Sequence, residues 1–150
     1  MVKRPLALFC FVLLAAGTLL WSQPSSFRQS DEPLSFVGMK LDDLIKRFGS
    51  PQNVYAVRGG ETWQDDVVFV YREGEFYIYR DRVWQAGLQS FYNMRVGDAK
   101  AVALLVLGEN VEDRGDYLIY TFPGTAWPLL LRVNCNAGKI SAIFIYRSDY

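Results

Sequence analysis

The chain has 150 residues, 51% of them apolar, and its sixteen basic and sixteen acidic side chains give a formal net charge of zero. This length fits one domain or two small packed modules, and the apolar content excludes general disorder. A neutral chain lacks the basic surface that binds nucleic acid, so we exclude nucleic acid as a partner. The absence of histidine removes the commonest general base and metal ligand, and with them every Ser-His or Cys-His catalytic pair.

The N-terminus has the layout of an export signal. Lys3 and Arg4 precede an apolar run, residues 5–21, and polar residues follow it. The run is long for a signal, short for a membrane-spanning helix, and ends without a clean cleavage site. We therefore predict that residues 1–22 are either a signal peptide or an uncleaved anchor that associates with the membrane through residues 5–21. In both cases the rest of the chain is exported.

Residues 23–36 form a polar segment after the apolar run. They include Pro24 and Pro33 and show neither helical nor strand periodicity. We predict that this segment is a tether and that the folded region begins at residue 37.

A pattern of Val-Gly, ten residues and Gly occurs twice, at residues 37–49 and 96–108. Within each copy, apolar residues at i, i+1 and i+4 lie on one side of a helix. We expect a short helix in each copy, ending at Gly49 and at Gly108, because glycine is favoured just past helix C-termini. The helix side chains that we expect to be buried are Leu44, Ile45, Phe48, Leu104 and Leu107.

Three strand-like segments follow each predicted helix, joined by short turns that suit antiparallel neighbours. The six segments are residues 67–71, 76–80, 82–86, 117–122, 129–133 and 140–146. We predict an α+β fold of two tandem repeats, residues 37–88 and 89–150, each a helical segment followed by an antiparallel sheet of three to four strands. The sequence leaves open whether the two repeats share one sheet.

The segment at residues 76–80 carries large side chains on both faces. Side chains alternate along a strand, so its two tyrosines lie on one face, and Phe76 and Ile78 lie on the other. If the second pair packs on the helix, the tyrosines either form a binding surface, which aromatic rings favour, or are covered by a sheet or loop. The residues that we expect to form the binding surface are Tyr71, Tyr77, Tyr79 and Trp84.

No arrangement of side chains in the sequence points to catalysis or to a bound metal. The acidic pair Asp42-Asp43 suits the start of a helix, and Asp65-Asp66 suits a turn. The acidic residues between 109 and 116 lack the alternation and central glycine of a calcium loop. Cys135 has no histidine partner, and we interpret it as a small core or edge residue. We therefore expect a protein that is not an enzyme and that uses no cofactor.

Two families share features with this pattern. Residues 38–51 resemble a signature of the SmpA/OmlA-like proteins, small lipoproteins of the outer-membrane β-barrel assembly machinery. The residues that carry this resemblance are Gly38, Leu41, Leu44, Ile45, Phe48, Gly49, Ser50 and Pro51. Trp63 and the strand pair at residues 76–86 are similar to that family's W-x-Y region and hairpin. The second half keeps Gly97 and Gly108 and has Asn110 where the first half has Pro51.

Two such units in tandem look like the β-lactamase inhibitory protein, whose repeats offer a concave binding surface. The first resemblance implies a protein-binding component of the bacterial cell envelope, with an assembly or scaffold role. The second implies a secreted or periplasmic enzyme inhibitor. Both imply an exported protein, in the periplasm or outer envelope or anchored to the inner membrane, whose partner is another envelope or secreted protein. The sequence identifies neither that partner nor the oligomeric state.

Overall fold

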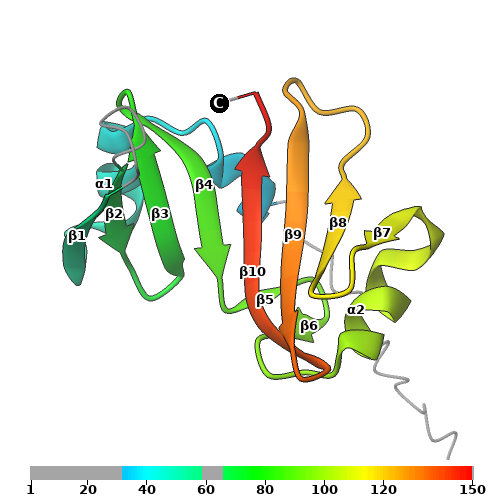
Figure 1. Ribbon diagram of the computed structural model, residues 1–150. Helices are drawn as coiled ribbons and strands as arrows, with labels where there is room; N and C mark the ends of the chain where they lie inside the picture. The colour runs from blue at the N-terminus through cyan, green and yellow to red at the C-terminus, as the bar shows by residue number, and fades with distance from the viewer. Residues whose placement is uncertain (1–31, 59–65, 150) are drawn as a thin grey trace, which may run out of the picture.

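One antiparallel sheet of eight strands dominates the computed structural model, which describes residues 32–58 and 66–149. The strand order is β1-β2-β3-β4-β10-β9-β8-β7 (Figure 1). These strands are β1 (Asn53–Val57), β2 (Asp66–Val70), β3 (Gly74–Tyr79), β4 (Arg82–Leu88), β7 (Val111–Asp113), β8 (Tyr117–Thr121), β9 (Leu129–Asn136) and β10 (Lys139–Arg147). The helical segments are η1 (Glu32–Phe36), α1 (Leu41–Phe48), α2 (Lys100–Leu107) and η3 (Gly108–Asn110). A small hairpin of β5 (Ser90–Phe91) and β6 (Met94–Arg95) precedes α2.

The predicted fold class, α+β with two tandem repeats that each have a sheet, is wrong. The described chain is mostly strand with two short α-helices, and both halves contribute to one sheet. The two halves join where β4 pairs with β10, from Leu88 opposite Ile143 to Gln85 opposite Tyr146. The physical reason is that two four-stranded sheets would leave two apolar inner strands with open edges, and pairing these strands removes both edges.

All six predicted strand segments exist, and their ends differ from the predicted ones by at most three residues. Each half runs inward from an edge strand, from β1 to β4 and from β7 to β10. The predicted export segment, residues 1–22, and residues 23–31 of the predicted tether lie outside the described residues, as do Trp63 and Asp65. The remaining residues of the predicted tether form η1, and Phe36 is buried in the core.

Both α-helices end where the sequence predicts. Gly49 has a φ of 78° and Gly108 a φ of 71°. Glycine adopts these left-handed angles without a steric penalty, so it stops the helix at little cost. The Gly49 amide donates a hydrogen bond of 2.8 Å to the Ile45 carbonyl oxygen, and Gly108 makes the same bond to Leu104.

The start of each helix is held by the last hairpin of its own half. The Gly38 amide donates to the Val83 carbonyl oxygen at 2.7 Å, and the Gly97 amide donates to the Ile140 carbonyl oxygen at 2.8 Å. Both glycines have left-handed angles, with φ of 93° and 100°. These contacts tie α1 to β4 and α2 to β10, so the two central strands also position the helices.

The core lies on one face of the sheet. Along β3, Phe76 and Ile78 are buried while the two tyrosines between and after them are half-buried, which confirms the predicted alternation. On the helices, Leu44 and Leu107 are buried, and Phe48 and Leu104 are partly buried against the core. The prediction for Ile45 is wrong, because its side chain is 41% exposed. One residue turns a helix by about 100°, so the position after Leu44 leaves the narrow buried stripe of so short a helix.

Four aromatic rings pack together beneath α1. The ring of Phe76 lies 5.4 Å from that of Phe36, 5.7 Å from Phe48 and 5.8 Å from Tyr71, measured between centroids. Tyr71 is buried, and its hydroxyl donates to the Gly49 carbonyl oxygen at 3.2 Å. The prediction that Tyr71 belongs to a binding surface is therefore wrong. It lies two residues after Phe69, which pairs with the buried Phe76, so strand alternation directs its ring into the core.

Replacing Phe76 with alanine should lower the free energy of unfolding by about 3–5 kcal/mol, because a fully buried ring that contacts three others leaves a cavity. Denaturant unfolding of the full chain, followed by tryptophan fluorescence, measures this change. The matched control is Leu105→Ala on α2, where the side chain is 83% exposed. The control should stay within about 0.5 kcal/mol of the wild type. Equal effects of the two variants would contradict this description of the core.

Candidate functional site

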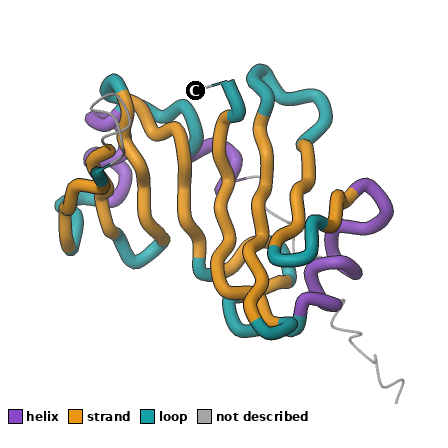
Figure 2. The backbone as a smooth tube through the Cα atoms, viewed as in Figure 1, coloured by secondary structure: helices purple, strands orange, loops and turns teal. Residues whose placement is uncertain are grey.

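The face of the sheet opposite the core is called here the open face. In the view of Figure 2 no helix passes in front of its central strands. Residues paired across antiparallel strands point to the same side, so the register identifies this face. One row across it consists of Tyr55, Val68, Tyr77, Gln85, Tyr146, Leu130 and Thr121. The next row consists of Asn53, Val70, Glu75, Gly87, Phe144, Arg132, Ile119 and Glu112.

A β-bulge brings Trp84 onto the open face. The β3–β4 register passes from Tyr77 opposite Gln85 to Ile78 opposite Val83, which leaves Trp84 as the extra residue. In a bulge two residues of one strand oppose a single residue of the other. Trp84 therefore lies beside Tyr77, with ring centroids 6.3 Å apart and the planes at 73°. This edge-to-face arrangement is one that aromatic pairs favour.

Two carboxylates accept hydrogen bonds from aromatic side chains on the open face. The Trp84 Nε1–H donates to Asp66 Oδ1 at 3.1 Å, and the Tyr55 hydroxyl donates to Glu75 Oε2 at 3.1 Å. We call these five residues the aromatic–acidic cluster: Tyr55, Asp66, Glu75, Tyr77 and Trp84. Its members come from β1, β2, β3 and β4, so the paired strands position every one of them.

The aromatic–acidic cluster packs over a buried side chain, that of Val68. Val68 lies on the open face between Tyr55 and Tyr77 in the register, yet its side chain is 0% exposed. Its burial shows that neighbouring side chains cover it closely, while Tyr77 and Trp84 remain half-buried. The cluster is thus a packed surface whose outer rings stay accessible to water.

The environment keeps the tyrosine hydroxyls of the cluster protonated. Burial, followed by the neighbouring Tyr55 and the Glu75 carboxylate, raises the pKa of Tyr77 to about 12. Burial and the charge of Glu75 also raise the pKa of Tyr55. At neutral pH the rings are therefore neutral, and the charge of the cluster is that of its carboxylates.

The structure brings together two of the four residues predicted for the binding surface, Tyr77 and Trp84. Tyr79 is half-buried on the same side of β3, next to Arg80, whose guanidinium lies 5.1 Å from the tyrosine ring centroid. Tyr71 is a core residue. Sequence reasoning missed Tyr55, because residues 52–66 carry no clear strand pattern, and it missed the bulge that turns Trp84 toward Tyr77.

The middle of the open face is shaped by a glycine. A Cβ atom built on Gly87 of β4 would lie 3.2 Å from the ring of Phe144 on the neighbouring strand β10. The missing side chain therefore leaves room for this ring to lie against β4. Further along the face, the Arg132 guanidinium lies 4.2 Å from the ring centroid of Tyr117. The open face thus carries acid near β2 and β3 and a cation on β9.

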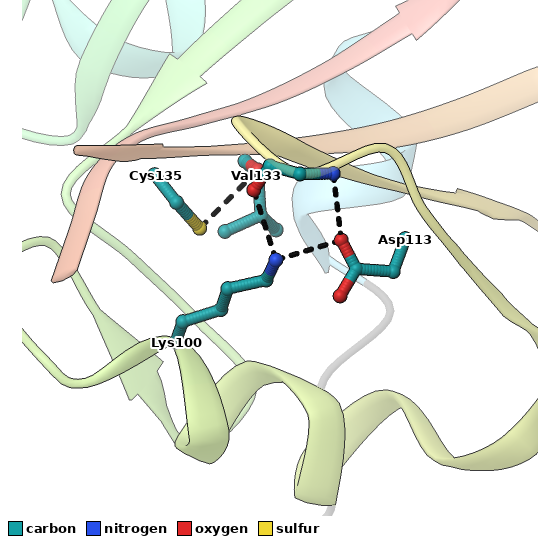
Figure 3. A network of polar contacts seen from close by, with 5 residues as sticks. Lys100, Asp113, Val133 and Cys135 are labelled. Atoms are coloured by element: carbon teal, nitrogen blue, oxygen red, sulfur yellow. Dashed lines mark hydrogen bonds and ion pairs between the residues drawn. The ribbon is translucent and has the colours of Figure 1, made fainter. Parts of the chain in front are cut away.

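A second polar network fastens α2 to the loop between β7 and β8 (Figure 3). Lys100 Nζ donates to Asp113 Oδ1 at 2.6 Å and to the Gly115 carbonyl oxygen at 2.9 Å. The Gly115 amide also donates to Asp113 Oδ1, and these hydrogen bonds lower the pKa of the Asp113 carboxyl. Nearby, burial raises the pKa of the Cys135 thiol, which is half-buried. The role of Asp113 in this network is therefore structural: it holds Lys100 of α2 and the Gly115 amide.

The acidic pair of α1 also has a structural role, since Lys46 Nζ lies 2.9 Å from Asp42 and 3.5 Å from Asp43. Within residues 32–58 and 66–149, no group of three histidine, cysteine or acidic side chains is placed to hold a metal ion. In the same part of the chain, no helix combines the length and the apolar character needed to cross a membrane.

No protein-family model matches the chain. No curated protein matches it either. Among solved structures, the chain is similar to an extracellular protein that contains an SCP domain, from Bacillus anthracis strain Ames, with 12% sequence identity and a TM-score of 0.49. The alignment covers 77% of this chain and 45% of that protein, so the chain spans less than half of its length. Because the score and the identity are both low, we transfer neither fold nor function from it, and the two family resemblances stay predictions.

The raised pKa of Tyr77 predicts a loss of stability in strong alkali. Below pH 10 the hydroxyl is protonated in both the folded and the unfolded chain. Between the unfolded pKa of 10.0 and the folded value of about 12, only the unfolded chain loses the proton, so unfolding becomes more favourable as pH rises. Denaturant titrations at pH 9 and pH 11.5 should therefore show a stability drop that is smaller in Tyr77→Phe. An equal drop in both proteins would show that Tyr77 is not the group responsible.

Proposed function

We propose that the chain is an exported protein-binding module of the bacterial cell envelope, that it is not an enzyme, and that it holds another polypeptide against the open face. The observation that supports this most directly is the aromatic–acidic cluster. The rings of Tyr77 and Trp84 are half-buried, and the Trp84 indole and the Tyr55 hydroxyl already donate hydrogen bonds to carboxylates of the cluster. Tyrosine and tryptophan in such positions are the commonest anchors of protein interfaces.

The cluster favours a partner that presents lysine or arginine side chains. Cations bind over the faces of tryptophan and tyrosine, and nearby carboxylates strengthen the attraction. Here Trp84 and Tyr77 supply the rings, and Glu75 supplies a carboxylate that accepts a hydrogen bond from the neutral Tyr55 hydroxyl. A guanidinium suits this surface best, because its planar group can stack on a ring and bond to a carboxylate together.

The export part of the proposal is supported by the N-terminal order of basic, apolar and polar residues. An exported chain would work in the periplasm or outer envelope, or remain anchored to the inner membrane through residues 5–21. In all these places its partners would be other envelope or secreted proteins.

Crosslinking in intact cells tests where the partner binds. A photoreactive phenylalanine derivative replaces Tyr79 on the side of the cluster or, as a control, Leu105 on the exposed side of α2. We expect a discrete crosslinked product from position 79 and none of the same mass from position 105. Products of the same kind from both positions would count against the open face. Mass spectrometry of the product separates an assembly component from an inhibited secreted enzyme.

Replacing Trp84 with alanine should weaken binding of the identified partner at least tenfold, since it removes the ring and frees Asp66 from its indole contact. Trp127→Ala is the matched control, because Trp127 lies in the loop before β9 and packs beside Gly38. Glu75→Gln, which keeps the shape of the side chain, should weaken binding mainly at low salt. The measurement is calorimetric titration of the full-length variants. A Trp84→Ala protein that binds like the wild type would refute the proposed role of the cluster.

A further inference from the structure

The outer edge of β1 is the least protected part of the sheet. β1 pairs with β2 on one side, and among the described residues no strand pairs with its other side. All five of its residues, Asn53–Val57, are exposed. Val54 is 47% exposed, and Val67 on the neighbouring strand is 43% exposed. Such an edge presents a row of backbone N–H and C=O groups, together with apolar side chains, to any strand that approaches.

The opposite edge of the same sheet is protected. β7 has three residues, two of which are the acids Glu112 and Asp113. Lys100 from α2 is bound to Asp113 at 2.6 Å, so a helix is fastened to this edge. Short length, charge and a covering element are the usual means of blocking edge-to-edge pairing. β1 has neither charge nor proline within its span.

We propose that β1 pairs antiparallel with β1 of a second copy of this chain. A two-fold axis at Tyr55 places the two Tyr55 residues opposite each other, Val54 opposite Ala56, and Asn53 opposite Val57. Each strand then satisfies the open edge of the other, and the contact closes on itself as a two-fold interface must. Tyrosines directly opposite one another in an antiparallel pair are favourable neighbours.

Charge favours the antiparallel arrangement over an in-register parallel one. Residue 58 is an arginine, and the antiparallel arrangement sets it opposite the neutral Gln52 of the other copy. A parallel arrangement would instead bring the two Arg58 residues side by side, which like charges disfavour. On the core side of the sheet, Val54 and Ala56 share one face with Val67 of β2, as the pairing shows. Val54 and Ala56 would lie opposite Ala56 and Val54 of the second copy, with Val67 one strand farther from the axis.

The pairing has a consequence for the open face. A two-fold axis perpendicular to the sheet keeps the same face of both copies on one side. The two open faces would therefore join into one continuous surface with an aromatic–acidic cluster on each side of the axis. Five residues a strand form a small contact, so the dimer should dissociate on dilution. This inference does not depend on what the open face binds.

Analytical ultracentrifugation of the full chain tests the dimer, with a mild non-ionic detergent present to solvate residues 5–21. We expect the protein mass to rise from one chain to two with concentration. Val54→Lys should remain one chain where the wild type is two, because it sets a charge at the edge. Leu105→Lys adds the same charge at an exposed apolar position on α2 and should dimerise like the wild type. A wild type that stays monomeric, or a Val54→Lys protein that still dimerises, would overturn the proposal.

Disulfide trapping tests the register with a different readout. In a chain whose Cys10 and Cys135 are serine, Tyr55→Cys places two thiols directly opposite each other across the axis. Because opposed Cβ atoms lie about 4.5–5.5 Å apart, mild oxidation with copper phenanthroline should convert most of this protein to a crosslinked dimer. Leu105→Cys in the same background should give little dimer. Equal trapping from both positions would show that β1 is not the contact.

Discussion

The pairing of β4 with β10 is the constraint on which the rest of the structure depends. Ala86 and Ile145 face each other across this seam, and both are fully buried. A four-stranded sheet with one eight-residue helix buries too little apolar surface to be stable alone. The pairing of β4 with β10 combines the two small cores into one. The same two strands also hold the helices, since β4 accepts a hydrogen bond from the Gly38 amide and β10 accepts one from the Gly97 amide. Joining the halves therefore gives the described eight-stranded sheet one core face, one open face and two edges.

The open face is stable in water because its aromatic side chains are not purely apolar. The indole of Trp84 and the hydroxyl of Tyr55 donate to Asp66 and Glu75, so their polar atoms have partners without a covering layer. Val68 is buried beneath them, which gives the rings a fixed support. Rings held in this way lose little conformational freedom when a partner arrives, and such rigidity is what makes an aromatic side chain an effective anchor. The same contacts thus serve the free protein and would prepare it for the binding that we propose.

The sequence predicts the local features of this fold and misses the long-range ones. Gly49 and Gly108 end helices because a left-handed angle is a local property that glycine reveals. The alternation of Phe76 and Ile78 with the tyrosines of β3 is equally local. No local signal states that β4 pairs with β10, since the preference of a strand for its neighbour depends on packing between distant segments. The bulge at Trp84 breaks the strict alternation, so a parity argument cannot place this residue.

Tyr55 links the two surfaces that the structure leaves open. It is the central residue of the unprotected edge strand, and its hydroxyl bonds to Glu75 in the aromatic–acidic cluster. An edge strand held on one side only is among the least constrained parts of a sheet. Pairing its other side would restrict β1, and through the Tyr55 hydroxyl it would restrict the carboxylate that faces a partner. By linkage, a partner that binds the ordered cluster more tightly must also strengthen the pairing by the same factor. The position of this one tyrosine would therefore couple the proposed assembly of the chain to the proposed recognition by its open face.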